Sequence, residues 1–116
     1  MTDNIHWVYE GLIINRDLVY EKIGEIVAHV KANEVGALMY EYFLNENETM
    51  LTIYERYANN GAVLAHGDNM QPYIYFFEEA VQVKKFIVFG PVSAQVKELL
   101  SGFGAEFQKP IAGFVR

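Results

Sequence analysis

The chain has 116 residues, 52% hydrophobic and 21% charged, which predicts a single globular domain over residues 1–116 and excludes a disordered chain. Its formal net charge of −6 argues against nucleic-acid binding, and the absence of cysteine excludes disulfides and thiolate chemistry. No apolar run is long enough to cross a bilayer, and the acidic, polar N-terminus is unlike a signal peptide. We therefore expect a cytoplasmic protein that binds neither membrane nor nucleic acid.

The first predicted element is a strand over about Ile5–Ile14, in which apolar side chains alternate with more polar ones. Asn15 or Asp17 is a candidate cap for the helix that follows, which runs to about Asn33 with apolar residues at helical spacing. Gly36 marks the exit from this helix.

Two strands are predicted next, over about Ala37–Asn45 and Thr49–Ala58, joined by the polar turn "NENE". Neither strand has a clean polar face, whereas a sheet covered by helices on one side only should show one. Something must therefore cover the second face, and in so short a chain we expect a second copy of the same protein.

The rest of the chain predicts two short helices, a strand, an amphipathic helix and a final extended segment. The first helix covers about Gly61–Met70, the second begins at Pro72, and the strand covers about Val83–Phe89. The amphipathic helix ends at Gly102 and Gly104, and the last segment, Ala105–Val115, is expected to be an edge strand or an arm that can reach a partner. The order is that of an α+β, ferredoxin-like split βαβ fold (βαββαβ) with an appended helix and strand.

Few chemical motifs are present. No pair of the three histidines has metal-ligand spacing, and no nucleophile motif or glycine-rich phosphate loop occurs, so we expect neither a metal nor a nucleotide or flavin cofactor. The aromatic content is high, at 15%. Eight tyrosines must either pack in the core and at an interface or line a pocket.

His66 is the candidate catalytic residue. On a helix over Gly61–Met70 it would share a face with Ala62 and Ala65, with Asn69 one turn further on. Small alanines leave room beside the imidazole, which suits a pocket wall and equally a tight contact between helix and sheet. The residues alone leave both interpretations open.

The run "YEYFLNENETMLTIYERYANNGAVLAHGDNM" resembles the antibiotic biosynthesis monooxygenase family. The resemblance lies in a strand that ends in Glu-x-aromatic, Glu55 and Tyr57 here, and in a helical histidine, His66, about ten residues later. It implies a homodimeric α/β barrel whose protomers each keep a cavity between sheet and helices. It also implies oxygenation of quinols, phenols or polycyclic aromatics by molecular oxygen without metal or flavin.

Within that resemblance His66 would be the base that removes a proton from the substrate, since an imidazole titrates near ~6.5 and a phenol near ~10. Glu55 and Arg56 are expected to support structure. The candidate substrate-binding residues are Trp7, Tyr40, Tyr42, Tyr57 and Asn69.

Two alternatives remain open. The chain can be a non-catalytic small-molecule-binding or stress-associated dimeric module, because fold does not determine function. Less favoured is a haem-degrading monooxygenase, a relative that uses an Asn, a Trp and a His. Here Tyr57 stands in the place of that Trp, and Asn4 lies at the very start of its strand.

Overall fold

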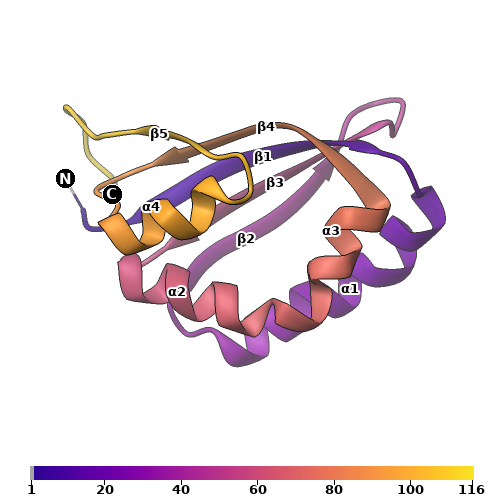
Figure 1. Cartoon of the computed structure of the whole chain (residues 1–116), viewed down its shortest axis with the longest axis horizontal. Coiled ribbons are helices and arrows are strands. Elements are labelled where there is room, and N and C mark those ends of the chain that lie inside the picture. The colour runs from indigo at the N-terminus through magenta and orange to yellow at the C-terminus, as the bar shows by residue number, and fades with distance from the viewer. Residues whose placement is uncertain (1) are drawn as a thin grey trace.

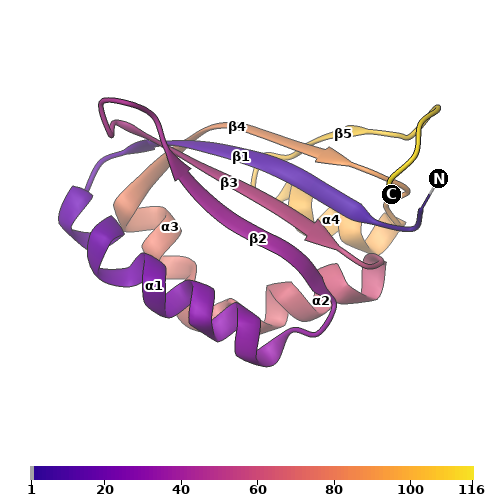
Figure 2. The same ribbon diagram turned by 180° about the vertical axis from the view of Figure 1, so that it is seen from behind.

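The computed structural model describes residues 2–116 and consists of a five-stranded sheet with helices packed on one face (Figures 1 and 2). The strands lie in the order β2-β3-β1-β4-β5. Central β1 is antiparallel to β3 and β4, and β5 adds to β4 in parallel. The strands are β1 (Ile5–Ile13), β2 (Ala37–Leu44), β3 (Met50–Tyr57), β4 (Val81–Phe89) and β5 (Glu106–Gln108). The predicted ferredoxin-like α+β fold is confirmed.

The helices begin where polar side chains cap them. The bounds are α1 (Arg16–Asn33), α2 (Asn60–Asn69), the 3₁₀ turn η1 (Gln71–Tyr73), α3 (Ile74–Ala80) and α4 (Ala94–Ser101). Asn15 caps α1 by accepting the backbone N–H of Leu18, so the cap is Asn15 and not Asp17. Asn59 caps α2 and Ser93 caps α4 in the same way.

The predicted alternation along β1 and β3 separates an inner face from an outer one. Trp7 pairs with Glu55 and with Val88, and all three are buried toward the helices. His6 and Arg56 pair on the opposite face. The register therefore places Glu55 on the inner face of the sheet and its neighbour Arg56 on the outer face.

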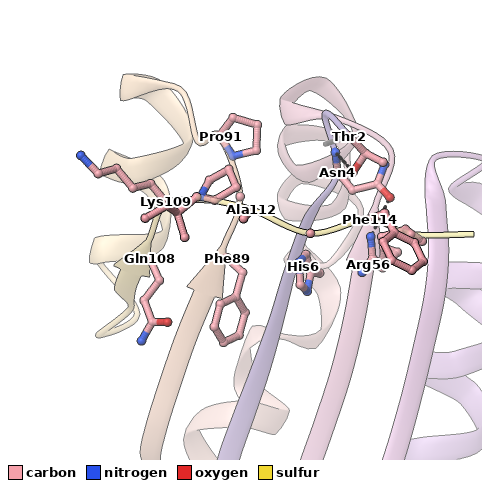
Figure 3. Close-up of a pocket in the computed structure, with 15 residues that line it drawn as sticks. Thr2, Asn4, His6, Arg56, Phe89, Pro91, Gln108, Lys109, Ala112 and Phe114 are labelled. Carbon is pink, nitrogen blue, oxygen red and sulfur yellow. Dashed lines mark hydrogen bonds between the residues drawn. The ribbon is translucent and has the colours of Figure 1, made fainter.

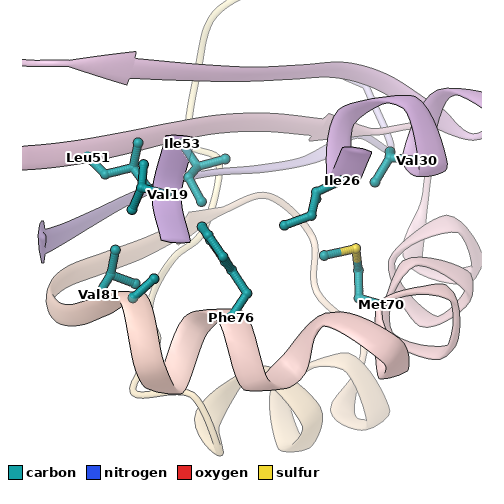
Figure 4. Packing of buried hydrophobic residues seen from close by; sticks show 9 residues of the cluster. Val19, Ile26, Val30, Leu51, Ile53, Met70, Phe76 and Val81 are labelled. Atoms are coloured by element: carbon teal, nitrogen blue, oxygen red, sulfur yellow. The ribbon is translucent and has the colours of Figure 1, made fainter. Parts of the chain in front are cut away.

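The core consists of two apolar clusters. In the first, Val19, Ile26 and Val30 of α1 pack with Phe76 of α3 and Ile53 of β3 (Figure 4). The second joins the inner face of the sheet to α2 and α4. Its buried members are Ile5, Trp7, Tyr57, Val63, Phe86, Val88, Val96 and Leu100. The appended α4 thus belongs to the core.

The outer face of the sheet has no cover within residues 2–116 apart from the C-terminal segment at one end. It carries Val8, Tyr54, Ile87 and Phe89, and on β2 the half-exposed Phe43. The predicted homodimer remains a prediction.

The last segment is only briefly a strand. β5 ends at Gln108, before Pro110, which has no backbone N–H to extend the ladder. The chain then runs across the outer face, where it encloses a pocket of about 400 Å³ with His6, Phe89 and Arg56 (Figure 3). No helix within residues 2–116 combines the length and the apolarity that a membrane span requires.

Candidate active site

A cavity of about 590 Å³ lies between the inner face of the sheet and helices α2, α3 and α4. Its walls come from both core clusters, so it occupies the space where the two meet. Most of the lining is apolar, with Trp7, Glu55 and His66 gathered on it and Gln71 and Glu78 also contributing. An apolar cavity with a few convergent polar groups is the usual form of a small-molecule site.

His66 reaches this cavity because α2 lies very close to the start of β2. A Cβ at Gly36 would be 2.6 Å from the Cβ of Ala62, so only a glycine allows this approach. His66 follows Ala62 by one turn of α2, and its side chain is 13% exposed. The imidazole lies between the carboxyl groups of Glu34 and Glu55. Its Nδ1 lies 2.8 Å from Oε1 and 3.0 Å from Oε2 of Glu34, and its Nε2 lies 3.4 Å from Oε1 of Glu55.

Glu55 is buried on the inner face of β3 and is held by two donors. The indole Nε1 of Trp7 donates to Oε2 at 2.6 Å, and the hydroxyl of Tyr57 donates to Oε1 at 2.6 Å. Burial raises the pKa of Glu55, and the neighbouring His66 and the two hydrogen bonds oppose that rise. The burial effect dominates, so the carboxyl group of Glu55 holds a proton more tightly than an exposed glutamate does.

Aromatic rings surround His66. The ring centroids of Tyr57 and Tyr40 lie 4.9 and 5.7 Å from the imidazole, and that of Trp7 lies 6.2 Å away. The hydroxyls of Tyr40 and Tyr42 are hydrogen-bonded at 2.8 Å. Burial raises the pKa of Tyr40, Tyr42 and Tyr57 far above the usual value, so these groups remain protonated and serve as hydrogen-bond partners.

The structure brings only some of the predicted site residues to the cavity. Trp7 and His66 line it, whereas Tyr40 and Tyr57 pack on the imidazole without being part of the lining. Tyr42 contacts Tyr40, and Asn69 donates to Glu34 and does not line the cavity either. Glu55, expected to support structure, lies in the cavity wall 3.4 Å from His66.

Arg56 lies on the other side of the sheet from Glu55. Its Nη1 donates to the side chain of Asn4 at 2.8 Å, and both residues line the outer pocket shown in Figure 3. Arg56 therefore does not pair with Glu55, because adjacent residues of a strand point to opposite faces.

Two functional candidates were missed in the sequence. Glu34 follows α1 and precedes the turn at Gly36, so it reads as a helix end, and nothing in the pattern connects it to His66, 32 residues away. Tyr9 lines the cavity, and burial raises its pKa to about 12. Tyr9 lies two residues after Trp7 on β1, so the two side chains share a face, and this spacing was sufficient to place Tyr9 beside Trp7.

The residues present do not fit haem ligation. His66 has Glu34 at one ring nitrogen and Glu55 at the other, and Asn4 lines the outer pocket, away from His66. Among residues 2–116 no group of three or more His, Cys, Asp or Glu side chains has an arrangement that can hold a metal ion.

Comparisons with known proteins identify the fold. No protein-family model and no curated protein sequence matches the chain. Several solved structures are similar to the chain. MupZ from Pseudomonas fluorescens superposes with a TM-score of 0.82 at 17% identity, over 100% of this chain and 91% of MupZ. A point mutant of SnoaB from Streptomyces nogalater, named a cofactor-independent oxygenase, superposes with a TM-score of 0.63 at 10% identity, over 80% of this chain and 97% of SnoaB.

A Caulobacter crescentus protein assigned by name to the antibiotic biosynthesis monooxygenases superposes with a TM-score of 0.62 at 21% identity, over 75% of this chain and 86% of its own. The chain therefore has the fold of the antibiotic biosynthesis monooxygenases, as its sequence resemblance indicated. With MupZ, the similarity extends over the appended α4 and β5 as well.

Proposed function

We propose that the chain is a member of the antibiotic biosynthesis monooxygenase family and oxygenates a small phenol or quinol with molecular oxygen and no cofactor. The observation that carries this proposal is the pair His66 and Glu55, 3.4 Å apart in the wall of an apolar cavity. The fold shared with SnoaB, named a cofactor-independent oxygenase, supports the reaction class. We place the reaction in the cytoplasm.

The reaction begins with a proton transfer. Nε2 of His66 takes the proton of a substrate hydroxyl, and the resulting anion is electron-rich enough to transfer an electron to oxygen. For a quinol, one atom of O₂ then enters the ring to give a hydroxyquinone, and the other leaves as water. The substrate supplies both electrons and both hydrogens of that water, so the balance needs no external reductant.

Glu55 and the aromatic walls have separate tasks in this scheme. Glu55 is the proton donor for the oxygen species that is reduced, because it lines the cavity 3.4 Å from Nε2 of His66 and burial raises its pKa. Trp7, Tyr9 and Phe86 offer ring faces and edges to an aromatic substrate and exclude water from its anion. The cavity volume lies within the range of small-molecule sites.

Oxygen uptake with a panel of hydroquinones and phenols tests this proposal. We expect His66→Ala to lower kcat/KM by about 100-fold or more, the usual contribution of a general base. His6→Gln is the matched control, because His6 lies on the outer face of the same sheet. Wild-type turnover no faster than that of His66→Ala would remove His66 from the mechanism, and no uptake with any member of the panel would contradict oxygenation.

The geometry also favours a second reaction class, acid–base catalysis without oxygen. Glu55, whose pKa burial raises, can protonate an oxygen that leaves a carbon atom while His66, 3.4 Å away, takes the proton of the attacking hydroxyl. No electrons are exchanged in such a step. Turnover that is unchanged under anaerobic conditions would support this class and exclude oxygenation.

A non-catalytic role is the remaining alternative. A binding or stress-associated module would use the same cavity without proton transfer. Thermal stabilisation by apolar phenols, with neither oxygen uptake nor product formation, would favour that role.

The proposed assembly is a homodimer through the outer face of the sheet. That face carries Val8, Ile87, Phe89 and Phe43, apolar side chains of the kind that a second sheet covers. Light scattering at micromolar concentration is expected to give twice the mass of the chain. A monomer would contradict the assembly.

A further inference from the structure

Glu34 occupies a position that ordinarily disfavours a carboxylate. It is the C-cap of α1, where the negative end of the helix dipole repels an anion by about 0.3–1 kcal/mol. Its side chain is only 3% exposed, so it has also lost most of its hydration. A residue that breaks a local rule in this way is expected where function requires it.

The contacts of Glu34 explain how the carboxylate is tolerated there. Oε2 accepts from Nδ2 of Asn69 at 2.7 Å, and both oxygens lie within 3.0 Å of Nδ1 of His66. Asn69 is held in turn, since its backbone carbonyl lies 2.8 Å from Nε2 of His29 on α1. The ends of α1 and α2 are thus joined by polar contacts that reach the cavity only through His66.

These contacts determine which ring nitrogen of His66 can take a proton from the substrate. An ionised Glu34 only accepts hydrogen bonds, so its partner Nδ1 of His66 has to be the hydrogen-bond donor, that is, the protonated ring nitrogen. The other nitrogen, Nε2, faces Glu55 and the cavity and is the ring nitrogen that a substrate can reach. The other side chains that face the imidazole are Trp7 from β1, Tyr40 from β2 and Tyr57 from β3, and none of them competes for Nδ1.

We propose that Glu34 is a positioning residue that holds His66 in the Nδ1–H tautomer and aims Nε2 at the substrate, while Asn69 holds Glu34. This inference rests on the proposed role of His66 as base. When Nε2 takes a proton, the imidazolium is stabilised by a carboxylate that touches no substrate. Turnover then depends on Glu34 although the cavity does not include it.

Glu34→Gln tests the proposal with two measurements. Gln offers one acceptor oxygen to the two donors His66 and Asn69, so we expect nitrogen NMR of the ring to show the Nε2–H tautomer gaining at the expense of Nδ1–H. We expect kcat to fall by about 100-fold or more with little change in KM, because the variant disturbs the base and not the binding surface. Glu25→Gln, at an exposed position of α1, is the matched control and should leave both the tautomer and kcat unchanged.

An unchanged Nδ1–H tautomer in Glu34→Gln overturns the proposal, whatever the effect on kcat. Glu34→Asp keeps the charge and is expected to recover the tautomer and part of the rate. Should Glu34→Gln fail to fold, Asn69→Ala provides the same test, with a partial loss of the tautomer expected and full retention contradicting the role of Asn69. The NMR measurement needs no substrate, so absence of turnover would overturn the proposed function while the tautomer still decides the role of Glu34.

Discussion

Replacing Tyr57 with Phe measures how firmly the buried carboxyl group of Glu55 is held. The tyrosine is fully buried, and its hydroxyl donates to Oε1 of Glu55 at 2.6 Å. Without it, the remaining neighbour of Oε1 is Nε2 of His66 at 3.4 Å, beyond the usual N–H···O range. The ring keeps its packing against Trp7, whose centroid is 4.8 Å away, so the variant isolates one hydrogen bond.

The expected loss of unfolding free energy depends on the charge of Glu55. A hydrogen bond to a neutral carboxyl contributes about 1 kcal/mol, and one to a carboxylate about 1.5–3 kcal/mol. Burial raises the pKa of Glu55, so the folded protein binds its proton more tightly than the unfolded chain. Folding stability from this group is therefore present below the unfolded value near ~4.3 and falls as pH rises toward the raised value. The cost of Tyr57→Phe should grow across the same window, as Glu55 ionises.

Urea unfolding at pH 5 and pH 8, at one protein concentration, provides the measurement. We expect a loss of about 1 kcal/mol at pH 5 and a larger loss at pH 8, with a fall in Tm of about 4 °C per kcal/mol for a domain of this size. Tyr75→Phe, at a partly exposed site on α3, is the control and should lie within about 0.5 kcal/mol of wild type. A loss below about 0.5 kcal/mol at both pH values would refute the hydrogen bond. Equal losses of about 1.5–3 kcal/mol at both pH values would refute the raised pKa of Glu55, because the carboxyl group would then already be ionised at pH 5.

Three further predictions follow from the packing. Gly36→Ala should destabilise the fold by about 1–3 kcal/mol in urea unfolding, because the new Cβ meets Ala62, and Ala62→Gly should recover part of that loss; additive effects would contradict the contact. Phe103→Ala, at the half-exposed wall of the cavity, should weaken binding of an apolar phenol by about 5- to 10-fold in calorimetry with little change in Tm; unchanged affinity would exclude this part of the wall from the site. Ile87→Glu places a charge on the outer face and should give a monomer in light scattering where the wild type forms the proposed dimer, and a dimer that persists in the variant would locate the interface elsewhere.

Most of the fold was predictable because its signals are local. Period-two alternation on β1 and β3 and apolar spacing on α1 depend only on neighbouring residues, and each element appears where the pattern predicted it. The final strand is shorter than the segment expected over Ala105–Val115, since Pro110 and Gly113 leave β5 only Glu106–Gln108. The order of the elements was sufficient for the ferredoxin-like arrangement.

The candidate site was only partly predictable. His66 and Trp7 were expected at the cavity from the family resemblance and line it, whereas the residues alone left the direction of His66 open. Tyr42 and Asn69 were expected there for their chemistry, yet they bond to Tyr40 and Glu34 instead. Their residue types were compatible with binding, but which neighbour each would meet was not encoded in the spacing.

The sequence alone was enough to predict the order of the secondary-structure elements, the alternation of side chains along β1 and β3, and a histidine beside small residues on α2, but not which face of the sheet is the inner one. Tertiary structure decided that this histidine lies between two carboxyl groups. Glu34 comes from the end of α1 and Glu55 from β3, and they meet His66 only because Gly36 lets α2 approach β2. Burial and the pKa shift that it causes arise from this convergence of distant segments, which no local pattern records.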